Sequence, residues 1–387
     1  VPLEDGGACN LGSINLSRFV KDGFTPEASI DWDQLAESSE TLVRFLDNVV
    51  TWNEDLNALP KQRQAASETR RLGLGVMGIA DMLNQLGVAY DSEQGTMMIE
   101  KVMEYITNAS YQASSFIAKE KGASSIFDEE AYMECPFVKE ALSEQTHNMI
   151  RKNGLRNIAI MSIAPTGSIS NIVLGYKSEE KNYIGVSGGV EPIFSTFYTR
   201  RSESFGNKMF KVFHSTIQAY IDKMGIQEDI DKAEDVDEVL PEFLTRTAHK
   251  IDSVKRVGVQ GVIQRYIDHS ISSTINLPED VEPETISDIY IKAWKNKLKG
   301  VTIYRDGSRF PILSVENKMT EFQEMKNKSF SIMQENGETI DMAGDDIFKR
   351  PDGKLTTMYH HLKKMKTESE DESTTTETVA TTEEVKV

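Results

Sequence analysis

The sequence predicts an α/β fold whose strands run largely parallel. Short apolar runs typical of buried strands alternate with longer stretches of helical periodicity, and few segments carry the turn signals of a β-hairpin. Two of the apolar runs, residues 157–164 and 300–304, end directly in loops of small and polar residues. Because the loops at the carboxyl ends of parallel strands commonly carry the functional groups, these two loops are the first candidates for a site.

The first part of the chain is predicted to contain one strand and several helices. A glycine-rich turn leads into an alternating, strand-like segment that ends at Leu16. Residues 30–59 and 96–120 repeat apolar side chains at helical spacing, which predicts two long helices. Residues 62–86 are predicted to form a further helical region that glycines interrupt. Its Gly73–Gly78 stretch matches the dinucleotide pattern GxGxxG, but a polar run precedes it where that pattern needs a strand, so close backbone packing better explains the glycines.

The second part continues the alternation up to Pro311, after which the pattern weakens into a charged segment. The expected elements are a strand at 157–164, helices at 210–224, 259–270 and 285–296, and a strand at 300–304. These observations divide the chain into residues 1–312, a charged extension at 313–366 and a tail at 367–387. The tail is rich in Thr, Ser and Glu, has little to bury and is predicted to be disordered and acidic.

Composition limits the classes of function. The 387 residues carry a formal net charge of −18, which disfavours a nucleic-acid-binding protein because such proteins need clustered Lys and Arg. No run approaches the roughly 20 apolar residues that span a bilayer, and no secretion leader is evident, so we expect a cytoplasmic protein without a membrane partner. Two cysteines indicate a reducing compartment, and six dispersed histidines predict no metal site.

The loop after the 157–164 strand has the composition of a phosphate-binding turn. Glycine can expose main-chain N–H groups there, and the Thr and Ser hydroxyls add further donors, so an anion can be held without a lysine. The alternative is an ordinary strand-to-helix turn with a Ser or Thr cap. The candidate residues are Pro165, Thr166, Gly167, Ser168, Ile169 and Ser170.

Two further residues are candidates for chemistry. Cys9 lies in a Gly/Ala/Asn turn just before a strand, where a thiol is accessible, although a lone cysteine more often serves as a small apolar side chain. Tyr304 ends the 300–304 strand and is either a buried aromatic residue or a redox-active or substrate-facing tyrosine. Cys135 has no activating neighbour in the sequence and is predicted to be structural.

Six segments in order together resemble one known family. They are residues 8–16 (ACNLGSINL), 71–83 (RLGLGVMGIADML), 164–170 (APTGSIS), 188–192 (GGVEP), 273–278 (STINLP) and 301–309 (VTIYRDGSR). The segments and their order resemble those of the catalytic subunit of ribonucleotide reductases. The sequence around Tyr304 is most similar to the adenosylcobalamin-dependent class II enzymes. The resemblance implies that residues 1 to about 312 form the C-terminal part of a ten-stranded α/β barrel.

The resemblance also implies roles for the candidate residues. In the family a thiyl radical on a finger-loop cysteine abstracts the ribose 3′ hydrogen, and a cysteine pair then reduces the 2′ position and becomes a disulfide. Cys9 matches one member of that pair, and residues 165–170 match the segment that holds the substrate phosphates. Adenosylcobalamin is the implied cofactor, and an external dithiol, supplied by a thioredoxin-like protein, is the implied reductant. The expected activity is the reduction of ribonucleotides to deoxyribonucleotides for DNA synthesis.

The sequence departs from the family pattern in one respect that matters for activity. The finger-loop motif Asn-x-Cys-x-Glu and the partner of Cys9 are missing from residues 1–387, so we expect this chain alone to be inactive and to need the N-terminal part of the catalytic subunit, from the same gene or a split one. One alternative is a class I large subunit that works with a separate radical-generating small subunit. Another is a non-catalytic half-barrel that binds or assembles with a partner.

Overall fold

The computed structural model describes residues 3–202, 208–308, 321–333, 339–350, 352–372 and 385–386. The chain divides into two compact units, the first comprising residues 1–275 and 293–302 and the second residues 276–292 and 303–387. The sequence predicted boundaries at residues 312 and 366, which do not coincide with the bounds of these two units. Those domain boundaries stay a prediction. None of the helices in the described ranges has the length and apolar character needed to cross a membrane.

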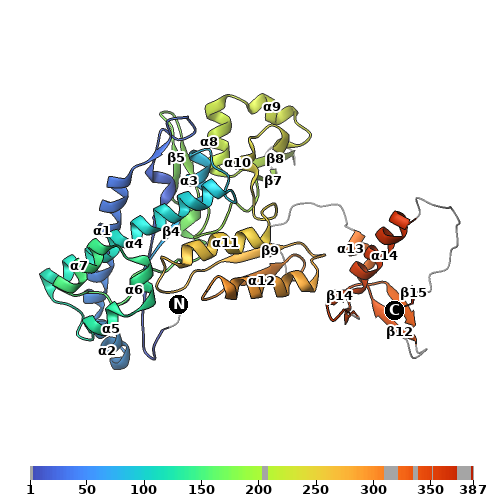
Figure 1. Ribbon diagram of the computed structural model, residues 1–387. Helices are drawn as coiled ribbons and strands as arrows, with labels where there is room; N and C mark the ends of the chain where they lie inside the picture. The colour runs from blue at the N-terminus through green and yellow to red at the C-terminus, as the bar shows by residue number, and fades with distance from the viewer. Residues whose placement is uncertain are drawn as a thin grey trace. The chain divides into compact units, whose positions relative to one another are not determined.

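Helices make up much of the described chain (Figure 1). In order they are α1 (Trp32–Asn53), α2 (Pro60–Thr69), α3 (Ile79–Gln85), α4 (Glu93–Lys121), α5 (Glu129–Met133), α6 (Pro136–Ala141), α7 (Glu144–Asn153), α8 (Ser215–Met224), α9 (Gln227–Lys232), α10 (Glu242–Thr245), α11 (Ser253–Gln264), α12 (Pro283–Lys295), α13 (Glu321–Met325) and α14 (Met358–Glu372). The described residues also form the short 3-10 helices η1 (Leu16–Phe19), η2 (Ile169–Asn171) and η4 (Val236–Glu238). The long helices predicted at 30–59 and 96–120 correspond to α1 and α4.

The strands are short. They are β1 (Asn10–Asn15), β2 (Val20–Lys21), β3 (Ser29–Ile30), β4 (Leu72–Met77), β5 (Leu174–Lys177), β6 (Asn182–Ile184), β7 (Phe197–Ser202), β8 (Lys208–Phe213), β9 (Thr274–Leu277), β10 (Thr302–Arg305), β11 (Ser329–Met333), β12 (Thr339–Ala343), β13 (Ile347–Lys349), β14 (Leu355–Thr357) and β15 (Val385–Lys386).

The core of the first unit is a parallel array of strands. β1 and β4 pair in parallel from Asn10↔Leu72 to Asn15↔Met77. The segment predicted as a strand at 157–164 comes next, although it forms isolated bridges and not a continuous strand: parallel bridges join Leu74 to Met161 and Ile163 to Ile271, so it lies between β4 and the chain leading into β9. The Thr302 N–H then donates to the Ser273 carbonyl at 3.0 Å. The order of strands in space therefore follows their order in the chain, as the α/β prediction requires.

The two faces of this array differ. Leu72, Leu74 and Val76 of β4 are fully buried, and α1 packs against both β1 and β4. On the opposite face β4 carries glycines, and Leu11 of β1 is 55 % exposed. Helices therefore cover one face of β1 and β4, and the other face, called here the uncovered face, carries Leu11 and Gly73.

The helical prediction for residues 62–86 is wrong in its middle. The structure forms α2, then β4, then α3, because Leu72, Leu74 and Val76 alternate at strand spacing. The glycines between them permit close approach: a Cβ atom at Gly75 would lie 2.3 Å from the Ser162 carbonyl oxygen. The explanation by close backbone packing is therefore confirmed, and GxGxxG lies largely within a strand instead of after one.

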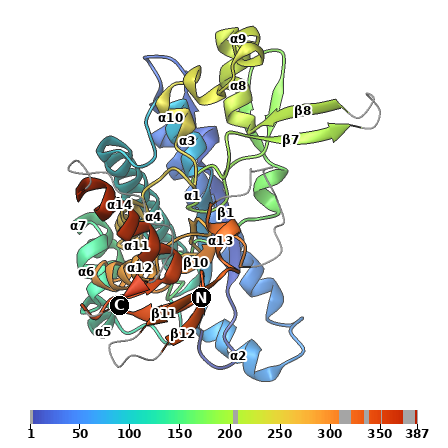
Figure 2. The ribbon, with the colours of Figure 1, turned by 90° about the vertical axis from the view of Figure 1, so that its right-hand side faces the viewer.

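The predicted helix at 210–224 begins too early, and hairpins are more frequent than expected. Residues 208–213 form β8, which pairs antiparallel with β7 as an arm that projects from the helices in Figure 2. β5 with β6, β11 with β12 and β13 with β14 are also antiparallel. Strand pairing between neighbouring segments outweighed the local helical spacing at 210–213.

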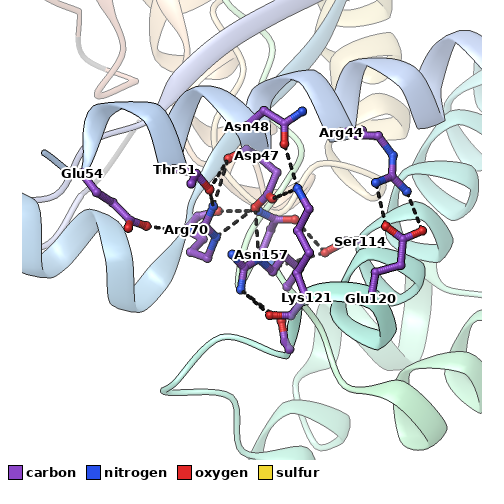
Figure 3. Close-up of polar contacts among 12 residues, drawn as sticks. Arg44, Asp47, Asn48, Thr51, Glu54, Arg70, Ser114, Glu120, Lys121 and Asn157 are labelled. Carbon is purple, nitrogen blue, oxygen red and sulfur yellow. Dashed lines mark hydrogen bonds and ion pairs between the residues drawn. The ribbon is translucent and has the colours of Figure 1, made fainter. Parts of the chain in front are cut away.

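A buried polar cluster joins the amino end of β4 to the helices (Figure 3). Arg70 donates through Nε to Asp47 Oδ1 at 2.9 Å, and both side chains are almost completely buried. Asn157 donates to the same Asp47 oxygen at 3.1 Å and to the Arg70 carbonyl at 2.9 Å. Figure 3 shows Asp47 between Arg70 and Lys121. This cluster ties α1, β4 and the 157–164 segment together at one end of the array.

The second unit contains the charged extension. Glu279 accepts hydrogen bonds from Lys326 at 2.6 Å and from Gln323 at 2.8 Å, and β11–β14 with α13 and α14 form small antiparallel pairs and helices. α14 runs to Glu372, so the first residues of the predicted disordered tail are helical. Residues 373–384 lie outside the described residues, and disorder there stays a prediction.

Candidate functional site

The loop at residues 165–170 follows the carboxyl end of the 157–164 segment, which bridges in parallel to β4. Pro165, Gly167, Ser168 and Ile169 are exposed, whereas Thr166 and Ser170 are buried. Within the described residues neither the Gly167 N–H nor the Ser168 N–H donates a hydrogen bond. A Cβ atom at Gly167 would meet nothing within 4 Å, so the space beside these donors is open. This geometry fits a main-chain anion site.

Thr166 holds the loop in an unusual conformation. Its φ angle is +53°, in the left-handed region that β-branched residues rarely adopt. The strain is offset by local bonds: Thr166 Oγ1 accepts from the Gly189 N–H at 2.9 Å, and the Thr166 carbonyl accepts from the Ser170 N–H at 2.9 Å. The hydroxyl therefore points inward as an acceptor for the protein itself.

Residues 185–191, called here the backing segment, lie directly against the loop. The Val186 N–H donates to the Ser170 carbonyl at 2.9 Å. Cβ atoms at Gly188 and Gly189 would lie 2.7 Å and 2.8 Å from the carbonyl oxygens of Pro165 and Ala164. Two motifs that are separate in the sequence thus form one structure, and glycine is required for this approach.

A buried carboxylate anchors the backing segment at one end. Asp81 Oδ2 accepts from the Ser187 N–H at 2.7 Å, and Asp81 Oδ1 accepts from His214 Nε2 at 2.7 Å and from the Thr216 hydroxyl. Burial alone would raise the pKa of Asp81, but His214 and these hydrogen bonds outweigh it and lower the pKa below its usual value. Asp81 is therefore held as a carboxylate.

A second ion pair anchors the other end. Glu191 accepts from Arg256 Nη2 at 2.9 Å and from the Thr274 N–H at 2.8 Å. Arg256 is buried and its Nη2 also donates to Ser273 Oγ at 2.8 Å. The Tyr90 hydroxyl adds a bond to the Val190 carbonyl at 2.5 Å. The backing segment is thus fixed to α3, α11 and the start of β9.

Cys9 lies at the opposite end of the strands from the loop. It immediately precedes β1, and a Cβ atom at Gly73 would lie 2.9 Å from its Sγ, which places the thiol on the uncovered face. Burial, with a smaller effect from Asp268, raises the pKa of Cys9 to about 11. The thiol is half-buried, free and protonated near neutral pH. The structure does not bring Cys9 into contact with the loop.

Tyr304 belongs to the second unit. It lies near the carboxyl end of β10 and is half-buried. The turn that follows is closed by a bond from the Ser308 hydroxyl to the Arg305 carbonyl at 2.6 Å, and Gly307 has a φ of +73°. The role predicted for Tyr304 stays a prediction.

Sequence reasoning missed the anchors Asp81, His214, Glu191 and Arg256. They are far apart in the chain, and only the fold brings them to the backing segment. Asp81 lies in the 71–83 motif and Glu191 in the 188–192 motif, so their place in these motifs could have marked them as candidate site residues. Among the described residues no group of three or more His, Cys, Asp or Glu side chains is arranged to hold a metal ion.

Comparison with known proteins matches residues 3–304 to "Ribonucleotide reductase, barrel domain". A vitamin B12-dependent ribonucleoside-diphosphate reductase of Mycobacterium tuberculosis is 32% identical over 80% of this chain and 41% of that protein. A protein of the same name from Thermoplasma acidophilum is 33% identical over 80% of this chain and 37% of that protein. This chain therefore spans about two fifths of the length of these relatives.

Other matches are more distant. The ribonucleoside-diphosphate reductase subunit alpha of Chlamydia pneumoniae is 28% identical over 85% of this chain and 33% of that protein. The solved structure of the Actinobacillus ureae class Id ribonucleotide reductase alpha subunit superimposes with a TM-score of 0.55 at 23% identity, covering 77% of this chain and 50% of that one, and so supports the fold. Since the family match covers most of the sequence, the chain belongs to the ribonucleotide reductase barrel-domain family.

Proposed function

We propose that this chain is part of the catalytic subunit of a ribonucleotide reductase that makes deoxyribonucleotides for DNA synthesis. The observation that carries the proposal is the open main-chain site at Gly167 and Ser168, at the carboxyl end of a strand in a reductase barrel domain. Relatives named as ribonucleoside-diphosphate reductases support a nucleoside diphosphate as substrate.

The loop at 165–170 binds the phosphates of the substrate. The N–H groups of Gly167 and Ser168 donate to no other described residue and are therefore available to bind an anion. Ser168 is exposed beside them. The Thr166 and Ser170 side chains are buried and face the protein interior. Thr166 stabilises the loop conformation by accepting a hydrogen bond from Gly189. Pro165 and Ile169 border the site.

Cys9 supplies one of two thiols that reduce the ribose. A ribonucleotide and a dithiol give a deoxyribonucleotide, a disulfide and water, so both thiol hydrogens leave the cysteine pair as a new S–S bond forms. A raised pKa suits this role because the sulfur keeps its hydrogen until the reaction. Tyr304 is proposed as a redox or substrate-facing residue.

The remaining parts of the active site come from outside this sequence. The N-terminal part of the catalytic subunit supplies the radical cysteine and the partner of Cys9. An external dithiol, provided by a thioredoxin-like protein in the cytoplasm, reduces the disulfide after each turnover.

Adenosylcobalamin is the proposed radical source, on the strength of the relatives named as vitamin B12-dependent. A cavity of about 370 Å³ between α1, α4 and α7 is at the small end of ligand sites and does not fit a corrin ring with its nucleotide tail. We therefore assign no residue of this chain to the cofactor.

The two cysteines provide a matched test of the proposal. In the complete enzyme with a dithiol reductant, Cys9→Ser should lower multiple-turnover production of deoxyribonucleotide by more than about 100-fold, because no disulfide can form. Cys135→Ser removes an exposed thiol and should leave the rate unchanged. Sustained turnover of the Cys9→Ser enzyme would refute the assignment.

The class I alternative differs in its radical source. The alpha subunits of Chlamydia among the relatives keep this alternative open. Purified complete enzyme should be inactive until adenosylcobalamin is added. Turnover that needs a separate small subunit instead would establish the class I alternative.

A further inference from the structure

The buried carboxylate of Asp81 is linked to the 165–170 loop through the backing segment, which bonds to Asp81 at Ser187 and to the loop at Val186 and Gly189. We propose that Asp81 is a positioning residue for nucleotide binding, which fixes the backing segment and through it the loop. The inference rests on the proposed role of residues 165–170 in holding phosphates. Asp81 itself lies too deep to touch a ligand, with no exposed side-chain surface.

The first step joins Asp81 to the backing segment. One carboxylate oxygen accepts from the Ser187 N–H at 2.7 Å, while the other holds His214 and Thr216 at the start of α8. The Ser187 carbonyl in turn accepts from the Gly78 N–H at 2.8 Å, just before α3. Ser187 is therefore bound on both its main-chain groups by residues on either side of the start of α3.

The second step joins the backing segment to the loop. Two residues beyond Ser187, the Gly189 N–H donates to Thr166 Oγ1 at 2.9 Å, and one residue before it the Val186 N–H donates to the Ser170 carbonyl at 2.9 Å. These bonds hold the left-handed conformation of Thr166, after which the open donors of Gly167 and Ser168 follow. A displacement of Ser187 therefore changes where those donors point.

The carboxylate charge is suited to this task. Hydrogen bonds from His214, Thr216 and Ser187 converge on it, and its pKa is lowered although it is buried. Without the carboxylate the buried Ser187 N–H loses its acceptor. The ion pair of Glu191 with Arg256 still anchors the far end of the segment, and the Gly78 N–H still bonds the Ser187 carbonyl, so the loss of Asp81 removes one of the bonds that fix Ser187.

The test compares two ligands in the complete enzyme. Asp81→Ala should weaken binding of a nucleoside diphosphate by at least 10-fold and leave binding of the corresponding nucleoside within twofold of wild type. A merely structural role would affect both ligands alike. Asp47→Asn is the matched control: it alters a buried carboxylate in the polar cluster at the other end of the strands and should lower thermal stability without changing the ratio of the two affinities.

Two further variants establish the path. Thr166→Val removes the acceptor for Gly189 in an isosteric side chain, and combining it with Asp81→Ala should add little to either single effect. Thr216→Val, which removes one bond to the carboxylate, should give a smaller change of the same kind and serves if Asp81→Ala does not fold.

The outcomes separate this inference from the proposed function. Ser168→Pro removes a main-chain donor of the loop at a φ of −90°, and Ser168→Ala removes only the hydroxyl. If Ser168→Pro weakens diphosphate binding while Asp81→Ala and Thr216→Val leave the affinity ratio unchanged, the positioning role is refuted. If Ser168→Pro also leaves the ratio unchanged, the phosphate-binding loop itself is refuted.

Discussion

At the scale of single residues, the side chains of the candidate phosphate loop bond to the protein itself, and main-chain N–H groups remain available to a ligand. The Thr166 hydroxyl accepts a hydrogen bond from the Gly189 N–H. The N–H groups of Gly167 and Ser168 donate to no other described residue. The loop could be predicted from sequence because small residues after an apolar strand are a local pattern. Asp81 and Arg256 could not, because the backing-segment residues that they bond, Ser187 and Glu191, lie more than sixty residues away in the chain.

Burial of Cys9 gives a pH-dependent prediction. Because its pKa is raised to about 11, the reactive thiolate is scarce at pH 8 and increases through pH 10 and above. The rate of alkylation by iodoacetamide, followed by mass spectrometry of the peptide that contains Cys9, should rise with pH toward a midpoint near 11. A midpoint below 8 would show that the thiol is instead activated.

The buried ion pair of Arg70 and Asp47 predicts a large loss of stability on substitution. Arg70→Met leaves Asp47 buried without its main partner and should lower the free energy of unfolding by about 3–5 kcal/mol. The matched control is Arg44→Met, whose ion pair with Glu120 is about two fifths exposed and should contribute about 0–1 kcal/mol. Denaturant unfolding measures both, and equal losses would contradict the assignment.

At the scale of elements, strand packing decides what local periodicity leaves open. Residues 72–77 carry leucines and valine at alternate positions, a pattern too short to distinguish from helix when polar helical residues precede it. Contacts with β1 and with residues 159–163 select the strand. The start of β8 was likewise missed because its partner β7 is a separate segment. The long helices α1 and α4 were predictable because their spacing repeats over many turns.

The glycine in β4 gives a prediction for the strand array. Gly75→Ala places a Cβ atom 2.3 Å from the Ser162 carbonyl oxygen, a backbone atom that cannot move independently, and should cost about 1–3 kcal/mol of stability. Gly258→Ala, at a position in α11 with nothing within 4 Å, should stabilise by about 0.5–1 kcal/mol. Thermal unfolding distinguishes the two; a Gly75→Ala protein as stable as wild type would contradict the packing.

At the scale of the whole molecule, the parallel strands separate the two candidate sites. The loop at 165–170 lies at their carboxyl end, and the Cys9 thiol lies at their amino end on the uncovered face. The proposed function assigns phosphate binding to the loop and reduction of the sugar to the thiol. The sequence motifs predicted both candidates, but their positions relative to each other required the register of the strands.

The most direct measurement is amide hydrogen exchange across residues 165–170 in the complete enzyme. A nucleoside diphosphate should slow exchange at Gly167 and Ser168 by at least 10-fold, because its phosphates accept from these N–H groups, and the corresponding nucleoside should not. Equal exchange rates with and without the diphosphate, under conditions where it is bound, would contradict the account.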